Sequence, residues 1–156
     1  METSLSRIKQ IFDIPGADIR SYSPLTLAYI GDGIYELVIR TILVEQGNCQ
    51  PQKLHKRASA LVKAQAQSDM MEVLTPLLTE SELSVYRRGR NAKSYTMAKN
   101  ATMGDYRRAT GFEALMGYLY LTEQMERMAE LLGHGLKKLG ELEEDAQECI
   151  GAGENT

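Results

Sequence analysis

Two acidic side chains stand in segments that are otherwise apolar. Asp32 lies between two glycines in the run Leu-Ala-Tyr-Ile-Gly-Asp-Gly-Ile-Tyr-Glu, residues 27–36, and Glu113 is the only charged residue in 109–121. Aspartate is a poor residue for the middle of a helix, and a lone carboxylate among apolar residues is costly unless something neutralises it. Both acids are therefore candidates for chemistry.

Two kinds of partner could neutralise these carboxylates. The structural alternative is a buried ion pair or a backbone cap, for example with Arg40, Arg108 or a tyrosine hydroxyl. The chemical alternative is a hard cation between two repelling carboxylates, and Mg²⁺ fits best because it accepts one or two carboxylates and keeps several waters. Such an ion can activate a water and stabilise a leaving phosphate oxygen, which would give metal-assisted phosphodiester hydrolysis. Glu36, one helical turn after Asp32, could support the site from behind or pair with Arg40 at the next turn, and the pairing with Arg40 is favoured.

A basic segment lies close in sequence to Glu113. Residues 86–108 contain seven bases and one acid, although the whole chain has a net charge of -3. The bases, interleaved with three tyrosines, are Arg87, Arg88, Arg90, Lys93, Lys99, Arg107 and Arg108. A charge run is most often a solvated face, but a basic segment in an acidic protein suits a polyanion, and nucleic acid is the commonest one. We therefore expect this segment to bind nucleic acid.

Helices must position these residues. Ser23-Pro24 predicts the N-cap and first turn of a helix that runs to Val44, and Pro51 opens another with helical apolar spacing to Ala66. Further helices are expected over 68–74 and from a capping box at 79–82 to about 89. Another should cover 105–121 with Asp105 as its cap. The last should run from 122 to about 132, where glycines 133 and 135 should break or kink it. No strand-like alternation occurs, so the expected fold class is all-α.

The two acid-bearing helices should be central, because both are apolar around nearly their whole circumference. Small residues at 114 and 117 should let a neighbouring helix approach the second one closely. The first helix carries apolar residues on more faces than so small a domain can easily cover, so a second subunit is a plausible cover for the rest. This pattern predicts a homodimer.

Composition bounds the remaining possibilities. The chain has 156 residues, which suits one domain, and no apolar run approaches the ~18 residues of a membrane span. We expect an N-terminal extension over 1–20, a catalytic domain over 21–140 and an acidic, frayed tail over 141–156. The N-terminus lacks the apolar stretch of a signal peptide, so we expect a cytoplasmic protein that does not associate with membranes. The scattered histidines and cysteines give no recognisable zinc site.

Several stretches of the chain resemble the ribonuclease III family. Residues 27–36 are similar to the signature helix of its catalytic domain, residues 112–121 (Phe-Glu-Ala-Leu-Met-Gly-Tyr-Leu-Tyr-Leu) to its second acidic helix, and residues 54–62 to the helix between them. The stretches Arg-Gly-Arg-Asn-Ala-Lys at 88–93 and Tyr-Arg-Arg-Ala-Thr at 106–110 are similar to the Mini-III branch. That branch keeps the nuclease domain and lacks the separate double-stranded-RNA-binding domain. The resemblance covers roughly residues 20–140.

The resemblance implies a ribonuclease III-type helical endonuclease domain, dimeric and dependent on Mg²⁺, that cleaves double-stranded RNA. Asp32 matches the family's catalytic aspartate and Glu113 its metal-binding glutamate, so both are expected to bind the ion and to act in catalysis. The seven bases are then expected to bind RNA. For Mini-III relatives the associated substrate is the precursor of large-subunit (23S) ribosomal RNA, with a ribosomal protein or pre-ribosomal particle as a further candidate partner.

The sequence departs from ordinary ribonuclease III at two acidic positions. Ala28 and Thr110 stand where that enzyme carries acids, which favours one tightly held ion over two. Gly33 replaces a common alanine and should loosen the helix without changing the chemistry.

Two other functions are compatible with the same helices: a non-catalytic RNA-binding or ribosome-assembly protein, and a dimerisation module with a fortuitous basic loop. The retained acids favour the enzyme, because a purely binding protein has no reason to hold two carboxylates beside polyanionic RNA.

Overall fold

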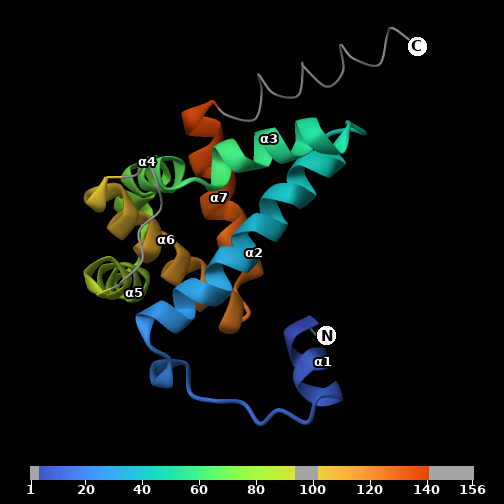
Figure 1. The fold of residues 1–156 in the computed structure, drawn as a ribbon. Helices are drawn as coiled ribbons and strands as arrows, with labels where there is room; N and C mark the ends of the chain where they lie inside the picture. The colour runs from blue at the N-terminus through green and yellow to red at the C-terminus, as the bar shows by residue number, and fades with distance from the viewer. Residues whose placement is uncertain (1–3, 94–101, 141–156) are drawn as a thin grey trace, which may run out of the picture.

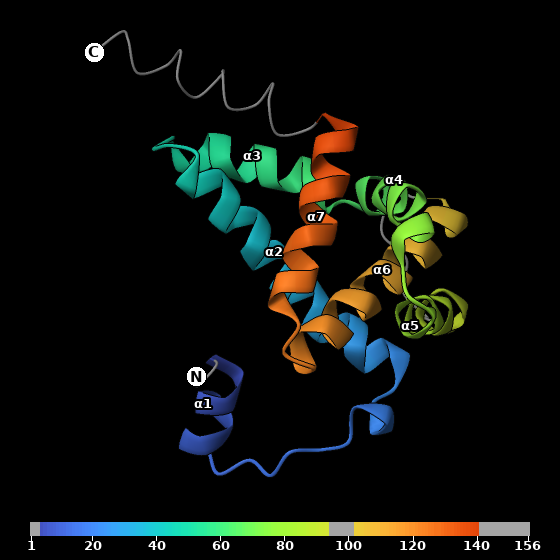
Figure 2. The same cartoon turned by 180° about the vertical axis from the view of Figure 1, so that it is seen from behind.

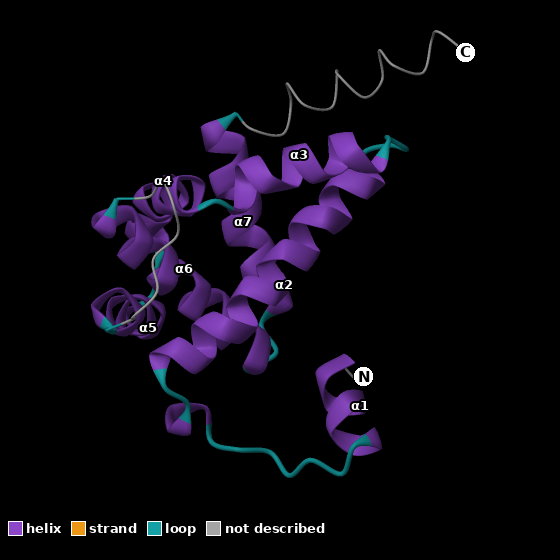
Figure 3. Ribbon diagram, viewed as in Figure 1, coloured by secondary structure: helices purple, strands orange, loops and turns teal. Residues whose placement is uncertain are grey.

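Every regular element that the computed structural model describes, over residues 4–93 and 102–140, is a helix (Figures 1 and 3). The α-helices are α1 (Ser4–Ile11), α2 (Pro24–Glu45), α3 (Pro51–Val62), α4 (Ala64–Leu74), α5 (Glu80–Asn91), α6 (Met103–Leu121) and α7 (Met125–Leu139). Short 3₁₀ turns cover Ile19–Ser21 and Thr75–Leu77. The expected all-α class is confirmed. None of the helices in these ranges is long and apolar enough to cross a membrane.

Helix α6 forms the centre of the domain. It lies between α2 on one side and α4 and α5 on the other, as the two opposite views in Figures 1 and 2 show. Its side chains at 112, 115, 116 and 119 have no exposed surface, so the expectation of a central helix is confirmed. Helix α2 differs, because only one face is buried, while Tyr29 is 82% and Leu37 59% exposed.

Glycines let α2 and α6 approach to backbone contact. A Cβ at Gly31 would overlap the backbone carbonyl of Glu113, and one at Gly117 would overlap the backbone carbonyl of Leu27. The close packing expected at position 117 is therefore confirmed. Gly33 is not needed for this close packing, because a Cβ there would meet no other group within 4 Å.

Side-chain caps fix the ends of several helices. The Ser23 hydroxyl accepts a hydrogen bond from the Thr26 amide, and Thr79 forms the expected capping box with Glu82. The cap expected at Asp105 is wrong. Helix α6 begins three residues earlier, because the Thr102 hydroxyl accepts from the Asp105 amide (3.1 Å) and donates to its carboxylate (2.8 Å).

Four other helix boundaries differ from expectation. The helix from Pro51 ends at Val62, where Lys63 takes an extended conformation (ψ 156), and α4 starts directly after it rather than at 68. Thr122 ends α6 instead of starting α7. Helix α7 also runs unbroken through both glycines, and Gly135 provides the room that the Met70 sulfur occupies.

The expected N-terminal extension contains α1, which stands apart from the other helices at the end of an extended segment (Figures 1 and 2). Ile8, Ile11 and Phe12 on this segment are exposed. The expected tail, 141–156, lies outside the described residues.

Candidate active site

The crossing of α2 and α6 brings the two candidate acids together. Gly31 packs on the backbone of Glu113 itself, and Asp32 is the next residue along α2. The Asp32 charge is close enough to raise the pKa of Glu113. Asp32 is exposed and Glu113 half-buried. The expectation that both would be buried is therefore wrong for Asp32, because the outer face of α2 is uncovered.

Each carboxyl group is harder to ionise than usual. Burial raises the pKa of Glu113 from its ordinary 4.5 to about 7, with the Asp32 charge as the second cause and a hydrogen bond from Gln67 acting in the opposite direction. Partial desolvation of the carboxyl group, which neighbouring protein atoms cover on one side only, also raises the pKa of Asp32, and the Glu36 charge adds to this rise. Neighbouring carboxylates that resist ionisation are the arrangement that a cation relieves.

The two arginines that could neutralise these acids pair with other carboxylates. Arg40 pairs with Glu36 (2.8 Å), as expected, and Arg108 pairs with Asp105 (3.0 Å). Among the described residues, neither Asp32 nor Glu113 has a cationic partner.

The number and type of ligand atoms in the candidate site limit which metal ion it can bind. Within the described ranges no group of three or more His, Cys, Asp or Glu side chains could hold a metal, so the candidate centre offers two carboxylates. Calcium requires six to eight oxygen ligands and structural zinc four ligands, whereas Mg²⁺ binds through one or two carboxylates and completes its shell with water. The chemistry of this pair therefore fits Mg²⁺.

One residue beside Glu113 escaped sequence reasoning. Gln67 of α4 has no exposed surface, and its Nε2 donates to the Val62 carbonyl at 3.0 Å as well as hydrogen-bonding Glu113. Its Oε1 is buried without a hydrogen-bond partner in the described structure. The signal was present, since this amide shares helical spacing with Met71 and Leu74 on the apolar stripe of α4.

Helix α5 holds part of the basic segment near the acids. A Cβ at Gly89 would lie 2.8 Å from the Ala114 Cβ and 2.9 Å from the Gly111 Cα, so the α5 backbone rests on α6 beside Glu113. Arg87 and Arg88, which directly precede Gly89 in sequence, are exposed and line a hollow of about 770 Å³ that also reaches Pro24.

The other basic residues are placed differently. Lys93 and Arg107 are exposed, whereas Arg90 is half-buried with its guanidinium 5.6 Å from the centre of the Tyr86 ring. Arg108 is tied to Asp105 and donates to the Ser68 hydroxyl at 2.6 Å, so it also braces α6 against α4. Lys99 lies outside the described residues.

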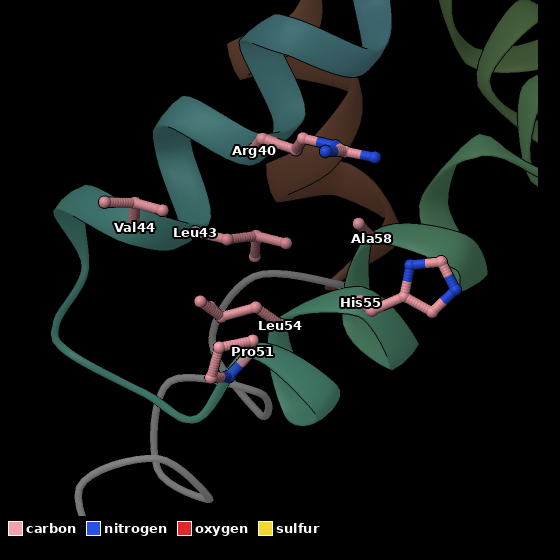
Figure 4. A pocket seen from close by; sticks show the side chains of 7 residues that line it. All are labelled: Arg40, Leu43, Val44, Pro51, Leu54, His55 and Ala58. Carbon is pink, nitrogen blue, oxygen red and sulfur yellow. The ribbon is translucent and has the colours of Figure 1, made fainter.

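A second hollow lies about two turns further along α2 from Asp32 (Figure 4). It has a volume of about 220 Å³ and is lined by Arg40, Leu43, Val44, Pro51, Leu54, His55 and Ala58. Leucine and proline side chains meet across it, with Arg40 and His55 at its rim (Figure 4). It contains no carboxylate, which separates it from the candidate active site.

The all-helical fold and the acid pair at the α2–α6 crossing define a ribonuclease III-type catalytic domain. A family model described as the Ribonuclease III domain matches residues 25–124. The chain is 50% identical over 129 residues to the Mini-ribonuclease 3 of Enterococcus faecalis, covering 81% of this chain and 98% of the relative. It is 41% identical to that of Streptococcus pneumoniae, covering 78% of this chain and 97% of the relative.

A solved structure from Fusobacterium nucleatum superposes with a TM-score of 0.70 at 32% identity, covering 79% of this chain and 98% of that one. The chain belongs to the Mini-ribonuclease 3 family. It is an endoribonuclease, and ribonuclease III-type enzymes act on double-stranded RNA.

The Glu113 carboxyl should make the stability of the metal-free protein fall as pH rises. Its pKa is about 7 in the folded chain against an ordinary 4.5, so between these values the folded state binds more protons than the unfolded state. The free energy of unfolding should therefore drop by about 2 kcal/mol from about pH 5 to about pH 8, a figure discounted for partial solvent screening. Urea denaturation in chelator measures this drop, and Glu113→Gln should remove it. An equal drop in the variant would contradict the assignment.

Proposed function

We propose that this endoribonuclease cleaves double-stranded RNA with Mg²⁺ held by Asp32 and Glu113, and that it matures the large-subunit (23S) ribosomal RNA precursor in the cytoplasm. The observation that carries the proposal is the pair of carboxylates at the α2–α6 crossing, which have no cationic partner among the described residues. The Mini-ribonuclease 3 relatives support the nuclease activity, and the substrate is inferred from that family.

The different exposures of the two acids indicate different roles in the site. Half-buried Glu113 is the fixed anchor, whereas exposed Asp32 faces the side from which RNA can approach. When bound, Mg²⁺ supplies water activation and neutralises charge on the phosphate. Arg87 and Arg88 bind phosphates of the RNA backbone and hold the duplex over the acids, and the hollow that they line is open to such a ligand.

We propose a single ion for each centre. Ala28, one turn before Asp32, is buried and carries no ligand atom. The Thr110 hydroxyl donates to the Tyr106 carbonyl at 3.0 Å within its own helix. Positions 28 and 110 therefore add no carboxylate to the pair at 32 and 113, and they supply no ligand for a second ion.

The direct test uses the purified full chain on duplex RNA and duplex DNA of equal sequence, with Mg²⁺ or with chelator. The expected result is cleavage of RNA only, with Mg²⁺ only, and discrete cuts in a large-subunit ribosomal RNA precursor. Tight binding without cleavage would favour an RNA-binding or ribosome-assembly role, and cleavage in chelator would refute the metal role.

Binding to duplex RNA should weaken steeply with salt, because Lys and Arg side chains displace counterions from phosphates. The double change Arg87→Gln with Arg88→Gln should flatten the slope of log affinity against log salt by roughly one to two. A filter-binding series over salt concentration measures the slope. The matched control is Lys137→Gln with Lys138→Gln, the same charge change at the exposed end of α7. Equal slopes for both pairs would place the RNA elsewhere.

We propose further that the enzyme is a two-fold homodimer formed through the outer face of α2. Tyr29, Gly33 and Leu37 follow one another at four-residue spacing on this face, and the first and last are largely exposed. The side-chain-free position at Gly33 leaves room for a second backbone. A two-fold dimer presents the same site to each strand of a duplex, whose backbones are themselves related by two-folds.

Sedimentation at micromolar concentration should give about twice the 17.4 kDa chain mass. Leu37→Glu should shift the protein to the monomer, because it places a charge in an apolar interface. Leu77→Glu is the control, since Leu77 is an exposed apolar residue on the turn after α4. Wild-type subunits exchanged with excess Asp32→Asn should produce mainly singly nicked duplex. A monomeric mass with full activity would contradict the dimer.

A further inference from the structure

The junction of α3 and α4 fixes the Gln67 side chain. The chain is extended at Lys63, so carbonyls in the last turn of α3 lose their helical donors. Gln67 turns back over this junction and its Nε2 donates to the Val62 carbonyl at 3.0 Å. Because a carbonyl can only accept, this bond determines which end of the amide is nitrogen and which is oxygen.

The same amide reaches the candidate active site. Gln67 hydrogen-bonds the Glu113 carboxyl, so this side chain links the α3–α4 junction to α6. The residue has no exposed surface, and its Oε1 has no hydrogen-bond partner in the described structure. Burying an unpaired acceptor costs free energy, which an apolar side chain of similar size would avoid. A polar residue at this cost, in contact with a catalytic candidate, points to a role in the site.

We propose that Gln67 is a positioning residue of the metal centre, which holds the Glu113 carboxylate at the α2–α6 crossing through Nε2 while the same nitrogen is anchored on the Val62 carbonyl. This inference rests on the proposed metal role of Glu113. Hydrogen-bonded partners of metal ligands orient those ligands, and their loss typically weakens metal binding 10–100-fold. Gln67 satisfies the chemistry of such a partner, because its amide nitrogen carries two donors, one for the Val62 carbonyl and one for the Glu113 carboxylate.

The test measures binding of Mn²⁺, as a paramagnetic substitute for Mg²⁺, to the protein without RNA. Gln67→Met keeps the length and removes both polar atoms, so Mn²⁺ affinity should fall about 10–100-fold. Cleavage should require correspondingly more Mg²⁺, while KM for duplex RNA at saturating Mg²⁺ stays unchanged. The matched control is Gln65→Met on the same helix, because Gln65 is exposed and its amide nitrogen donates to the Asp69 carboxylate (2.9 Å). Mn²⁺ affinity of this control should equal that of the wild type.

A double-variant cycle separates the inference from the proposed function. Glu113→Gln should weaken Mn²⁺ binding by itself, and adding Gln67→Met to it should cause little further loss. If Glu113→Gln binds Mn²⁺ normally, the proposed metal centre fails. If Glu113→Gln weakens binding and Gln67→Met does not, only the role of Gln67 fails. Should Gln67→Met not fold, Gln67→Asn replaces it, since an amide one methylene shorter cannot span both partners and the same loss of Mn²⁺ affinity is expected.

Discussion

Asp32→Asn and Glu113→Gln should each abolish Mg²⁺-dependent cleavage of duplex RNA while leaving the fold intact. Each change removes one of two carboxylates and alters side-chain volume very little. A bound metal supplies several kcal/mol of transition-state stabilisation, so its loss should lower the rate by roughly a thousandfold or more. Single-turnover cleavage under saturating protein measures the chemical step without interference from product release.

Stability in chelator distinguishes lost chemistry from lost structure. Both variants should melt at or above the wild-type temperature, because each removes a charge whose ionisation the site disfavours. Glu36→Gln is the matched control, since Glu36 lies one turn from Asp32 and its carboxylate is already paired with Arg40. Its cleavage rate should stay near that of the wild type. Substantial cleavage by Asp32→Asn or Glu113→Gln would remove that residue from the mechanism.

Local signals in the sequence were enough to predict most of the helices. Ser23 and Thr79 cap their helices through contacts three residues away, which a reader of the sequence can identify without the fold. Thr102 uses the same contact, but Asp105, three residues later, offers an equally good capping side chain, and the choice between them depends on how Asp105 also meets Arg108. The start of α6 was therefore misplaced.

Tertiary neighbours explain the expectations that failed. Glycines 133 and 135 should weaken an isolated helix, yet α7 continues because Gly135 accommodates Met70 from α4. The isolation of Asp32 and Glu113 among apolar residues identified them as a pair, but not their unequal exposure, which follows from the uncovered outer face of α2. Gln67 was missed because an amide on an apolar stripe acquires meaning only once its contact with Glu113 is known.

The second large effect is expected from one of the two glycines that flank Asp32. Gly31→Ala would place a methyl group on the Glu113 backbone carbonyl, where no flexible side chain can move aside. The helices would have to separate at the point where the acids converge, so we expect roughly 3 kcal/mol or more of destabilisation together with loss of cleavage.

Gly133→Ala provides the matched control, because it is the same substitution inside helix α7, away from the proposed dimer face, with no other group within 4 Å. There the better helix propensity of alanine should dominate and raise the free energy of unfolding by about 0.5–1 kcal/mol. Urea denaturation of both variants measures the difference. The opposite signs matter more than the magnitudes, since both variants gain the same intrinsic propensity and differ only in what the methyl group meets. Equal effects would mean that Gly31 does not set the spacing of α2 and α6, and the convergence of Asp32 and Glu113 would then need another cause.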